Sequence, residues 1–536
     1  MDHHGIVMGV IKDLDIIEQI NQKLNVYDDE KMSVGERVAA MIMNGLGFTD
    51  QPLSLLPEFF EELPLEELFG KKCTAEDFDR FSLSRALDRI YNYGEENLFA
   101  EVAAHACKTA GVDTSCQSFD TTSFSCSGEY DNETDEGCVK VTHGYSKDHR
   151  PDLKQIVTEL LVTHDNSVPL IMKNWDGNAS DSKIFEQRTQ KLLEDFKKGY
   201  TQHVIADSKF YTEDNSTHWD IVKFTTRVPE TIKLAKDKIA ETFSISDWIE
   251  HRDGKLKYIE FNVNHYSTDQ RWLVCSSEES LQRASKSIEN VVKKENEALN
   301  KALNQLQAKR FGCEEDANRS LQVIAKKWRY HRLDGIEIIK HFKYSTAGNP
   351  SNKEADRIEY QIKADAQHED NRVEQAKHKK SCFIIASNRD RSELSNDGII
   401  DSYKGQQSVE RGYRFLKDPH FFTSSFFLKK PERISALIMI MTLSLLVYTI
   451  AQKKLRESML EHKVTLPDQN KKLRDQITIK RAFQLLRGIN IVNLAIEGMV
   501  HNTVQGLNEF KRKIIFLIGG ACMKIYDVAP TEVGAT

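Results

Sequence analysis

The run ISALIMIMTLSLLVYTIA, residues 434–451, is the sequence feature that most constrains the fold. Its nearly unbroken apolar side chains reach the length of about 17 to 25 residues that a membrane-spanning helix needs. A helix buried on all sides at the centre of a large domain has the same composition. Because the rest of the chain is strongly polar, with 29% charged residues, we favour the buried helix. We therefore expect a core helix here and no membrane partner.

The charge is distributed unevenly along the 536 residues, which are enough for several domains. The whole chain carries −7; residues 429–536 hold 17 Lys and Arg against 9 Asp and Glu, which is +8 and leaves −15 for the remainder. A basic end on an acidic protein is compatible with DNA contact, and equally with a solvated face. The basic candidates there are Lys471, Lys472, Arg474, Lys511, Arg512 and Lys513.

Nine cysteines without any C-x-x-C pair indicate free thiols in a reducing compartment. The opening MDHHGIVMGVIKDLD lacks the basic start and long apolar run of a signal peptide. We therefore expect a cytoplasmic protein.

The periodicity of apolar residues divides the chain into five parts. Three- and four-residue spacing predicts a helical domain over 1–112, in which Ser33 and Glu36 form a capping box. Residues 113–230 alternate strands with a helix at 180–200, which is a mixed α/β order. Residues 231–376 break this order as an insertion; 377–455 resume it, and 456–536 form a basic helical C-terminal region. The strands predicted around the insertion are 118–126, 136–145, 167–175, 203–208, 221–229, 258–264, 271–277, 336–344, 357–365 and 381–388.

A long charged helix at 276–310 lies within the predicted insertion. Its apolar heptads are irregular, which favours a solvated spacer or the arm of a hairpin over a coiled-coil dimer.

The stretch DSYKGQQSVERGYRFLKD, residues 401–418, predicts a helix with one polar face. At about 100° per residue, its polar side chains at offsets of three, seven and fourteen fall on one side. They are Tyr403, Gln406, Glu410 and Lys417. An ordinary surface helix gives the same outline, so other parts of the chain must decide what this face does.

Two aspartates accompany Glu410 as candidate metal ligands. Asp120 lies inside a predicted strand, and Asp207 ends the apolar run HVIA. Carboxylates on two strands and a helix can converge to hold two divalent ions, which clamp a phosphoryl transfer when about 3.5 to 4 Å apart. Taken singly, an Asp at a strand end is more often the first residue of a turn.

The spacing Y-x-x-(R)-x-x-x-E-x-x-x-x-x-x-K resembles the signature of bacterial insertion-sequence transposases of the DDE type. The chain keeps Tyr403, Glu410 and Lys417, while Gln406 stands at the usual Arg position. Blocks in the order of the IS-four and IS-sixteen-thirty-four groups extend the likeness to about residue 455. They include HHGIVMGVIKDL, ALDRIYNYG, FDTTSFS, HGYSKDHRPDLKQ, IADSKFY, FTTRVPET and SVERGYRFLKDPHFF.

This resemblance implies a ribonuclease-H-like catalytic domain, a mixed sheet flanked by helices, interrupted by the insertion between Asp207 and Glu410. It implies Asp120, Asp207 and Glu410 as catalytic metal ligands for two Mg²⁺ ions, with Mn²⁺ as a substitute. DNA contacts are expected from Tyr403, Gln406, Lys417, Arg411, Arg414, Lys147, His149 and Arg150, although a solvated turn explains the last three equally well.

The function implied is DNA transposition. Such a protein binds terminal inverted repeats, cleaves at the element ends and joins 3′-hydroxyls to target DNA, as a homodimer assembled on DNA in the bacterial nucleoid. The 1–112 domain is the expected binder of the ends. The alternatives are a catalytically inactive DNA-binding relative, a nuclease that cuts without joining, and a membrane-anchored protein resting on 434–451 alone.

Overall fold

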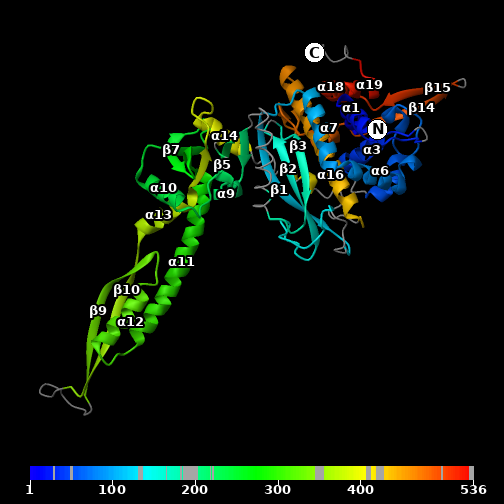
Figure 1. Ribbon diagram of the computed structural model, residues 1–536. Coiled ribbons are helices and arrows are strands. Elements are labelled where there is room, and N and C mark those ends of the chain that lie inside the picture. The colour runs from blue at the N-terminus through cyan, green and yellow to red at the C-terminus, as the bar shows by residue number, and fades with distance from the viewer. Residues whose placement is uncertain are drawn as a thin grey trace. The chain divides into compact units, whose positions relative to one another are not determined.

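The computed structural model describes the chain in two compact units, Met1–Thr226 with Gly398–Thr536, and Arg227–Asp397 (Figure 1). The predicted insertion, 231–376, falls within the second unit. The residues described are 1–27, 30–48, 52–130, 137–164, 166–180, 184, 203–217, 219, 222–344, 355–405, 412–413, 415–417, 428–496 and 499–529.

The first unit begins with helices throughout, as the three- and four-residue spacing predicts. Ser33 accepts a hydrogen bond from the Glu36 amide, and Glu36 accepts one from the Ser33 amide, so the predicted capping box is present. The helices are α1 (His4–Asp13), α2 (Ile16–Lys23), α3 (Val34–Gly47), α4 (Leu56–Glu61), α5 (Leu65–Phe69), α6 (Arg80–Tyr93) and α7 (Glu95–Thr109).

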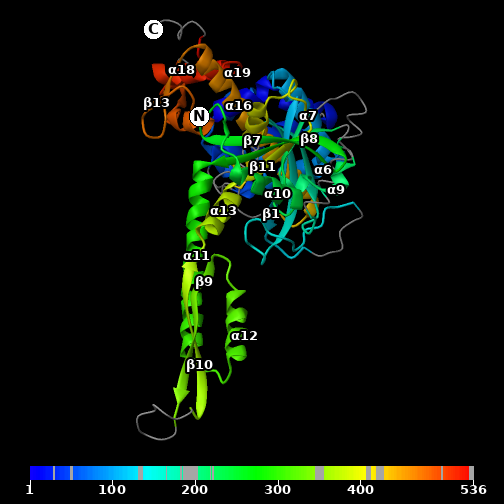
Figure 2. The ribbon, with the colours of Figure 1, turned by 90° about the vertical axis from the view of Figure 1, so that its left-hand side faces the viewer.

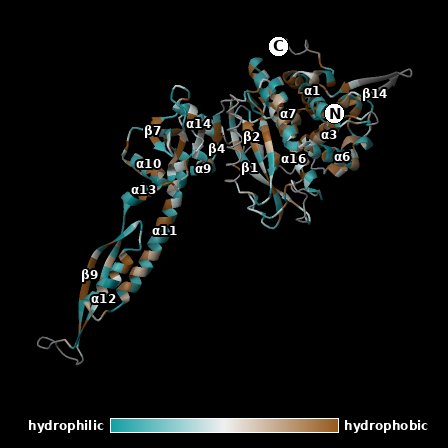
Figure 3. Cartoon of the chain, viewed as in Figure 1, coloured by the Kyte–Doolittle hydropathy of each residue, from teal (hydrophilic) through white to brown (hydrophobic). Residues whose placement is uncertain are grey.

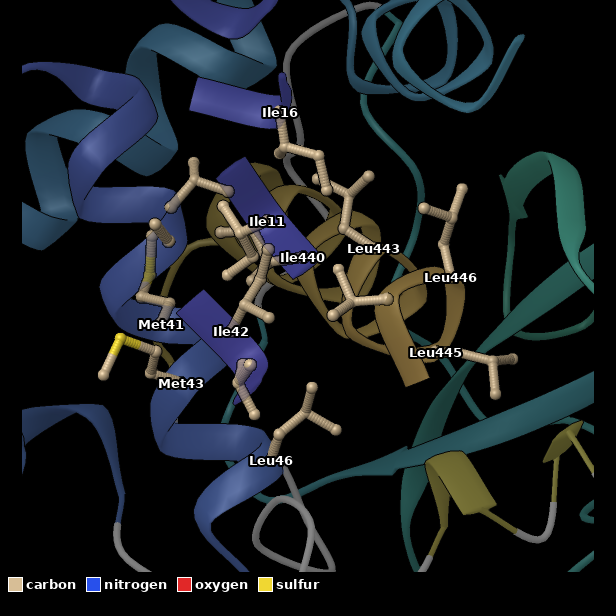
Figure 4. Close-up of a cluster of buried hydrophobic side chains, with 14 of the residues drawn as sticks. Ile11, Ile16, Met41, Ile42, Met43, Leu46, Ile440, Leu443, Leu445 and Leu446 are labelled. Carbon is tan, nitrogen blue, oxygen red and sulfur yellow. The ribbon is translucent and has the colours of Figure 1, made fainter. Parts of the chain in front are cut away.

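The apolar run forms most of helix α16 (Pro431–Glu461), which packs against α1, α3, α6 and α7 (Figure 4). Among the described residues it is the helix long and apolar enough to cross a membrane, and 94% of its apolar window is buried inside the protein. The prediction of a buried core helix is confirmed. Salt bridges secure its two ends: Arg433 donates to Asp88 of α6 at 2.7 Å, and Lys454 to Asp13 of α1 at 2.8 Å.

Five strands of a larger mixed sheet follow the N-terminal helices, in the order β3-β2-β1-β4-β5. Strand β2 is antiparallel to both β1 and β3, whereas β4 is parallel to β1 and to β5. Helices α7 and α16 pack on β3. The bounds are β1 (Cys116–Cys126), β2 (Lys154–Thr163), β3 (Pro169–Trp175), β4 (His203–Ala206) and β5 (Lys223–Arg227). The unit is therefore mixed α/β.

The strand predicted at 136–145 is wrong, and β2 takes its place in the sheet. Within 137–145 the backbone hydrogen bonds are made at isolated points: Lys140 bonds with Asp176 and Gly177 of a neighbouring turn, and Thr142 forms a single bridge with Gln155 of β2. Gly144 lies so close to this turn that an added Cβ would be 2.0 Å from the Gly177 carbonyl oxygen. A glycine in a predicted strand often marks such a close approach of another backbone segment. The helix predicted at 180–200 lies almost wholly outside the described residues.

The second unit contains the long charged helix as α11 (Glu278–Ala308), one side of a hairpin arm (Figure 2). Hydrophilic and hydrophobic residues alternate along it as teal and brown bands (Figure 3). Its apolar side packs on the hairpin β9 (His331–Lys343) and β10 (Arg357–His368), where Leu303 and Ile362 share a small core. The unit also contains α10 (Lys233–Glu241), β6 (Ile249–Glu250), β7 (Leu256–His265), β8 (Thr268–Ser277), α12 (Glu314–Ala325), α13 (Asp370–Ser381) and β11 (Phe383–Ser387).

The C-terminal region is only partly helical, which corrects the prediction for 456–536. Two short antiparallel strand pairs interrupt it, one joining 466–467 to 473–474 and the other joining 490–496 to 499–505. The elements are β12 (Leu466–Pro467), β13 (Leu473–Arg474), α17 (Ile479–Leu485), β14 (Asn490–Ile496), β15 (Met499–Gln505), α18 (Glu509–Ile518) and α19 (Ala521–Ile525).

Substituting one buried leucine of α16 tests the central role of this helix. Leu443 is fully buried, so Leu443→Ala removes packed methyl groups and is expected to lower the free energy of unfolding by about 2 to 5 kcal/mol. Leu460 on the same helix is 55% exposed, and Leu460→Ala is expected to change the free energy of unfolding by less than about 0.5 kcal/mol. Urea unfolding of both variants measures the difference; equal effects would contradict the burial of α16.

Candidate functional site

Asp120 and Asp207 lie side by side on neighbouring parallel strands. The register of β1 and β4 pairs Ser118 with Ile205. If this register is continued two residues beyond the last pair, Asp120 falls opposite Asp207. The backbone of Asp207 is still extended, at φ −75° and ψ −179°. Residues in register project from the same face of a sheet, and adjacent strands are about 4.8 Å apart. By this register, two carboxylates 87 positions apart in the sequence (207 − 120) fall on the same face of the sheet, near the end of β4.

Local hydrogen bonds fix the backbone of both aspartates. The Asp120 carboxylate accepts from the Thr121 amide at 2.7 Å. The Asp207 carboxylate accepts from the Lys209 amide at 2.9 Å and begins a short 3-10 turn, while Thr226 of β5 donates to the Asp207 carbonyl at 2.7 Å. Asp207 therefore initiates a turn, as an Asp at a strand end often does; each ionised carboxylate can accept about four hydrogen bonds.

The end of the predicted polar helix packs directly against the strand that carries Asp120. Tyr413 is 6% exposed and its hydroxyl donates to the Asp120 carbonyl at 2.6 Å. The Lys417 amide donates to the Tyr413 carbonyl at 3.0 Å, the bond of a helical turn, and Leu416 is buried with Phe124 in the main core. Gly412 faces α16, where an added Cβ would lie 3.3 Å from Leu445.

Lys417 lies between two carboxylates. Its ammonium group donates to Asp148 at 2.6 Å and interacts electrostatically with Asp120. Burial lowers the pKa of Lys417, and the hydrogen bond and charge of Asp148 oppose that shift. Lys147 also lowers this pKa because it is a like charge nearby. The cation is thus held in a half-buried position whose charge depends on its acidic neighbours.

The three candidates of the HGYSKDHRPDLKQ block have different surroundings. Lys147 donates to both the carbonyl and the hydroxyl oxygen of Thr121 at 2.6 Å. Arg150 is exposed and pairs with Asp152 at 2.7 Å, and His149 is exposed with a left-handed backbone at φ +57°. Lys147 therefore attaches this segment to β1 immediately after Asp120, whereas Arg150 and His149 lie at the surface.

Tyr403 lies in α14 (Asn396–Gly405), near the end of the helix. At Gly405 the chain passes close to His164 after β2, since an added Cβ would lie 1.9 Å from the His164 ring. Four predicted residues lie outside the described part of the chain: Gln406, Glu410, Arg411 and Arg414.

Sequence reasoning missed two contacts at this site. Asp148 lies between two residues of the block that it did single out, but its own partner, Lys417, is 269 positions away. At about 100° per residue Tyr413 falls beside the polar face, and its position three residues after Glu410 is a signal of proximity that the polar-face argument does not use.

Among the residues that the structure describes, no group of three or more His, Cys, Asp or Glu side chains is arranged to hold a metal ion. Asp120 and Asp207 supply carboxylate oxygens from two adjacent inner strands of the sheet. Such oxygen ligands suit a hard divalent cation such as Mg²⁺. The predicted third ligand is Glu410, beyond the described residues.

Comparisons with known proteins give limited matches. The family described as "Domain of unknown function (DUF4277)" matches residues 1–104. No curated protein matches. A solved structure titled "Cryo-EM structure of piggyBac transposase synaptic complex with hairpin DNA (SNHP)" aligns with a TM-score of 0.33 and 8% identity, covering 84% of this chain and 75% of that one. Such a low TM-score does not establish a shared fold.

Removing the Tyr413 hydroxyl tests whether this segment holds β1 in place. Tyr413→Phe loses the bond to the Asp120 carbonyl, so we expect about 0.5 to 1.5 kcal/mol less stability and faster amide hydrogen exchange in the peptide covering 118–126. Tyr130→Phe is the matched control, because the Tyr130 hydroxyl donates to the Leu428 carbonyl at 2.8 Å instead. Unchanged exchange at 118–126 in Tyr413→Phe would show that the bond does not restrain the strand.

Proposed function

We propose that this chain is a DNA transposase of the DDE type, which cleaves phosphodiester bonds at the ends of a mobile element and transfers the 3′-hydroxyl ends to target DNA. The observation that carries the proposal is the register of β1 and β4, which sets Asp120 beside Asp207. The resemblance of the Tyr403, Glu410 and Lys417 spacing to the transposase signature supports it independently.

The catalytic domain in this proposal is ribonuclease-H-like. Three antiparallel strands followed by two parallel ones, with Asp120 on the central strand and Asp207 at the end of its parallel neighbour, support that assignment. The unit Arg227–Asp397 is then an insertion within it, because the two parts of the first unit lie on either side of it in the sequence. The helical N-terminal domain is the proposed binder of the element ends.

Asp120, Asp207 and Glu410 would hold two Mg²⁺ ions, with Mn²⁺ as a substitute. Bound there, divalent ions supply charge stabilisation to a phosphoryl transfer and acidify an attacking water or hydroxyl. The chain's own contribution is positioning: the strands fix the two aspartates, and Tyr413 fixes the Asp120 backbone. Lys417 adds a positive charge beside Asp120, where a DNA phosphate would be stabilised.

The partner in this proposal is double-stranded DNA, the terminal inverted repeats and then the target. Two ends must be paired, so a homodimer on DNA in the bacterial nucleoid is the expected assembly. Tyr403, Gln406, Arg411, Arg414, His149 and Arg150 are the further proposed DNA contacts.

Cleavage and joining on a plasmid that carries the element's own ends test the function. With Mg²⁺, the wild type is expected to cut at the ends and form joined products. Asp120→Asn, Asp207→Asn and Glu410→Gln each remove a ligand charge and are expected to lower the rate by about 1,000-fold or more, the scale of losing a main electrostatic contact. Asp214→Asn is the control, because Asp214 is an exposed acid seven residues after Asp207.

The other outcomes separate the alternatives. Cutting without joining would favour a nuclease, and binding to the repeats without cutting would favour a DNA-binding relative. Equal activity of Asp207→Asn and Asp214→Asn would exclude Asp207 as a ligand.

Binding of the ion can be measured without DNA. Mn²⁺ titrated into the wild type is expected to raise the unfolding temperature, since an ion that binds only the folded state stabilises it in proportion to RT ln(1 + [L]/Kd). The variant that lacks both aspartates, Asp120→Asn with Asp207→Asn, is expected to show no such rise. An identical rise in both proteins would place the ion elsewhere.

A further inference from the structure

Lys417 is a partly buried cation with only 23% of its side chain exposed. A Lys side chain has a flexible four-carbon stem and a strongly hydrated ammonium group. Holding that ammonium group in one position away from water therefore requires a specific anionic partner. Its ammonium group lies 5.9 Å from the centre of the Phe124 ring, on the same strand as Asp120. The hydrogen bond to Asp148, at 2.6 Å, can determine the position of the Lys417 ammonium group.

Asp148 lies in a turn that is attached to the strand carrying Asp120. The Lys147 amide donates to Ser123 Oγ of β1 at 3.2 Å, and the Lys147 ammonium group to Thr121 at 2.6 Å. On the other side of Asp148, the Arg150 amide donates to Ser146 Oγ at 3.1 Å. These bonds fix the backbone on both sides of Asp148, and its 37% exposed side chain bonds Lys417.

We propose that Asp148 is a positioning residue of the active site: it aims the Lys417 ammonium group at the place beside Asp120 where a DNA phosphate is bound. The proposal rests on the DNA cleavage proposed above. Lys147 then has a different role from the DNA contact expected from the sequence. Its ammonium group donates to the carbonyl and hydroxyl oxygens of Thr121, and these bonds anchor the turn that presents Asp148.

An ordinary surface ion pair is the competing explanation, and such pairs contribute only about 0 to 1 kcal/mol. The same segment contains one. Arg150 and Asp152 form a pair with three hydrogen bonds at 2.7 to 3.2 Å, and both side chains are more than half exposed. This pair offers a control of the same chemistry, four residues from Asp148 and separate from Lys417.

Steady-state cleavage of the element ends compares Asp148→Asn, Asp148→Glu and Asp152→Asn. We expect Asp148→Asn to lower kcat by about 10- to 100-fold, the loss that follows small misplacement of a catalytic group, with KM and unfolding temperature little changed. Asp148→Glu retains the charge and is expected to recover part of the loss, and Asp152→Asn is expected to match the wild type. The pair Asp148→Asn with Lys417→Met is expected to be no slower than Lys417→Met alone, because residues that act together are not additive.

A second measurement does not depend on cleavage. Acetic anhydride labelling of the whole protein, read by mass spectrometry, reports how exposed and how fully charged the Lys417 amine is. Loss of its anionic partner is expected to raise Lys417 labelling several-fold in Asp148→Asn and to leave it unchanged in Asp152→Asn.

The two readouts separate the failure of each proposal. A wild type that never cleaves overturns the transposase function and, with it, the catalytic role of Asp148, whatever the labelling result. If the wild type cleaves and Asp148→Asn cleaves equally fast, or if labelling of Lys417 does not change in that variant, the positioning role is wrong while the transposase function stands.

Discussion

Burial of one apolar helix is the physical constraint on which the first unit depends. Helix α16 has apolar side chains on all sides, so water is excluded only if other elements surround it. The N-terminal helices α1, α3, α6 and α7 and strand β3 do this (Figure 4), which joins residues from both ends of the chain into one core. Leu416 and Tyr413 are buried in the same core. Their packing holds the segment that ends in Lys417 against β1.

The candidate site lies where this core meets polar groups. Tyr413 and Leu416 are packed in the apolar core, and Lys417 follows directly at its margin. Lys417 is held by Asp148, and Lys147 holds the turn that carries Asp148. Because half-buried charges interact more strongly than exposed ones, this arrangement gives more control over geometry than a surface pair such as Arg150 with Asp152.

Much of the fold follows from local patterns. The helices of 1–112, the strands β1, β3, β4 and β5, and the long α11 appear where the periodicity predicts them. The strand predicted at 136–145 failed because alternating valines are a local pattern, whereas a strand needs a continuous partner; this segment bonds at isolated points to Asp176, Gly177 and Gln155. The hairpin β14–β15 was missed for a related reason, since pairing between two short segments is set by the turn and the neighbouring packing and only weakly by composition.

The sequence by itself determined which acids to consider and the helical or extended character of most segments, since each depends on residue type and short-range spacing. It favoured burial of 434–451, which the packing of the other elements around this helix decided. The tertiary structure decided which of them meet. Strand register brings Asp120 to Asp207, and a bond across 269 positions joins Lys417 to Asp148. Short-range sequence patterns predict neither contact. Strand register depends on which faces are buried, and bringing distant segments together depends on the packing of the whole core.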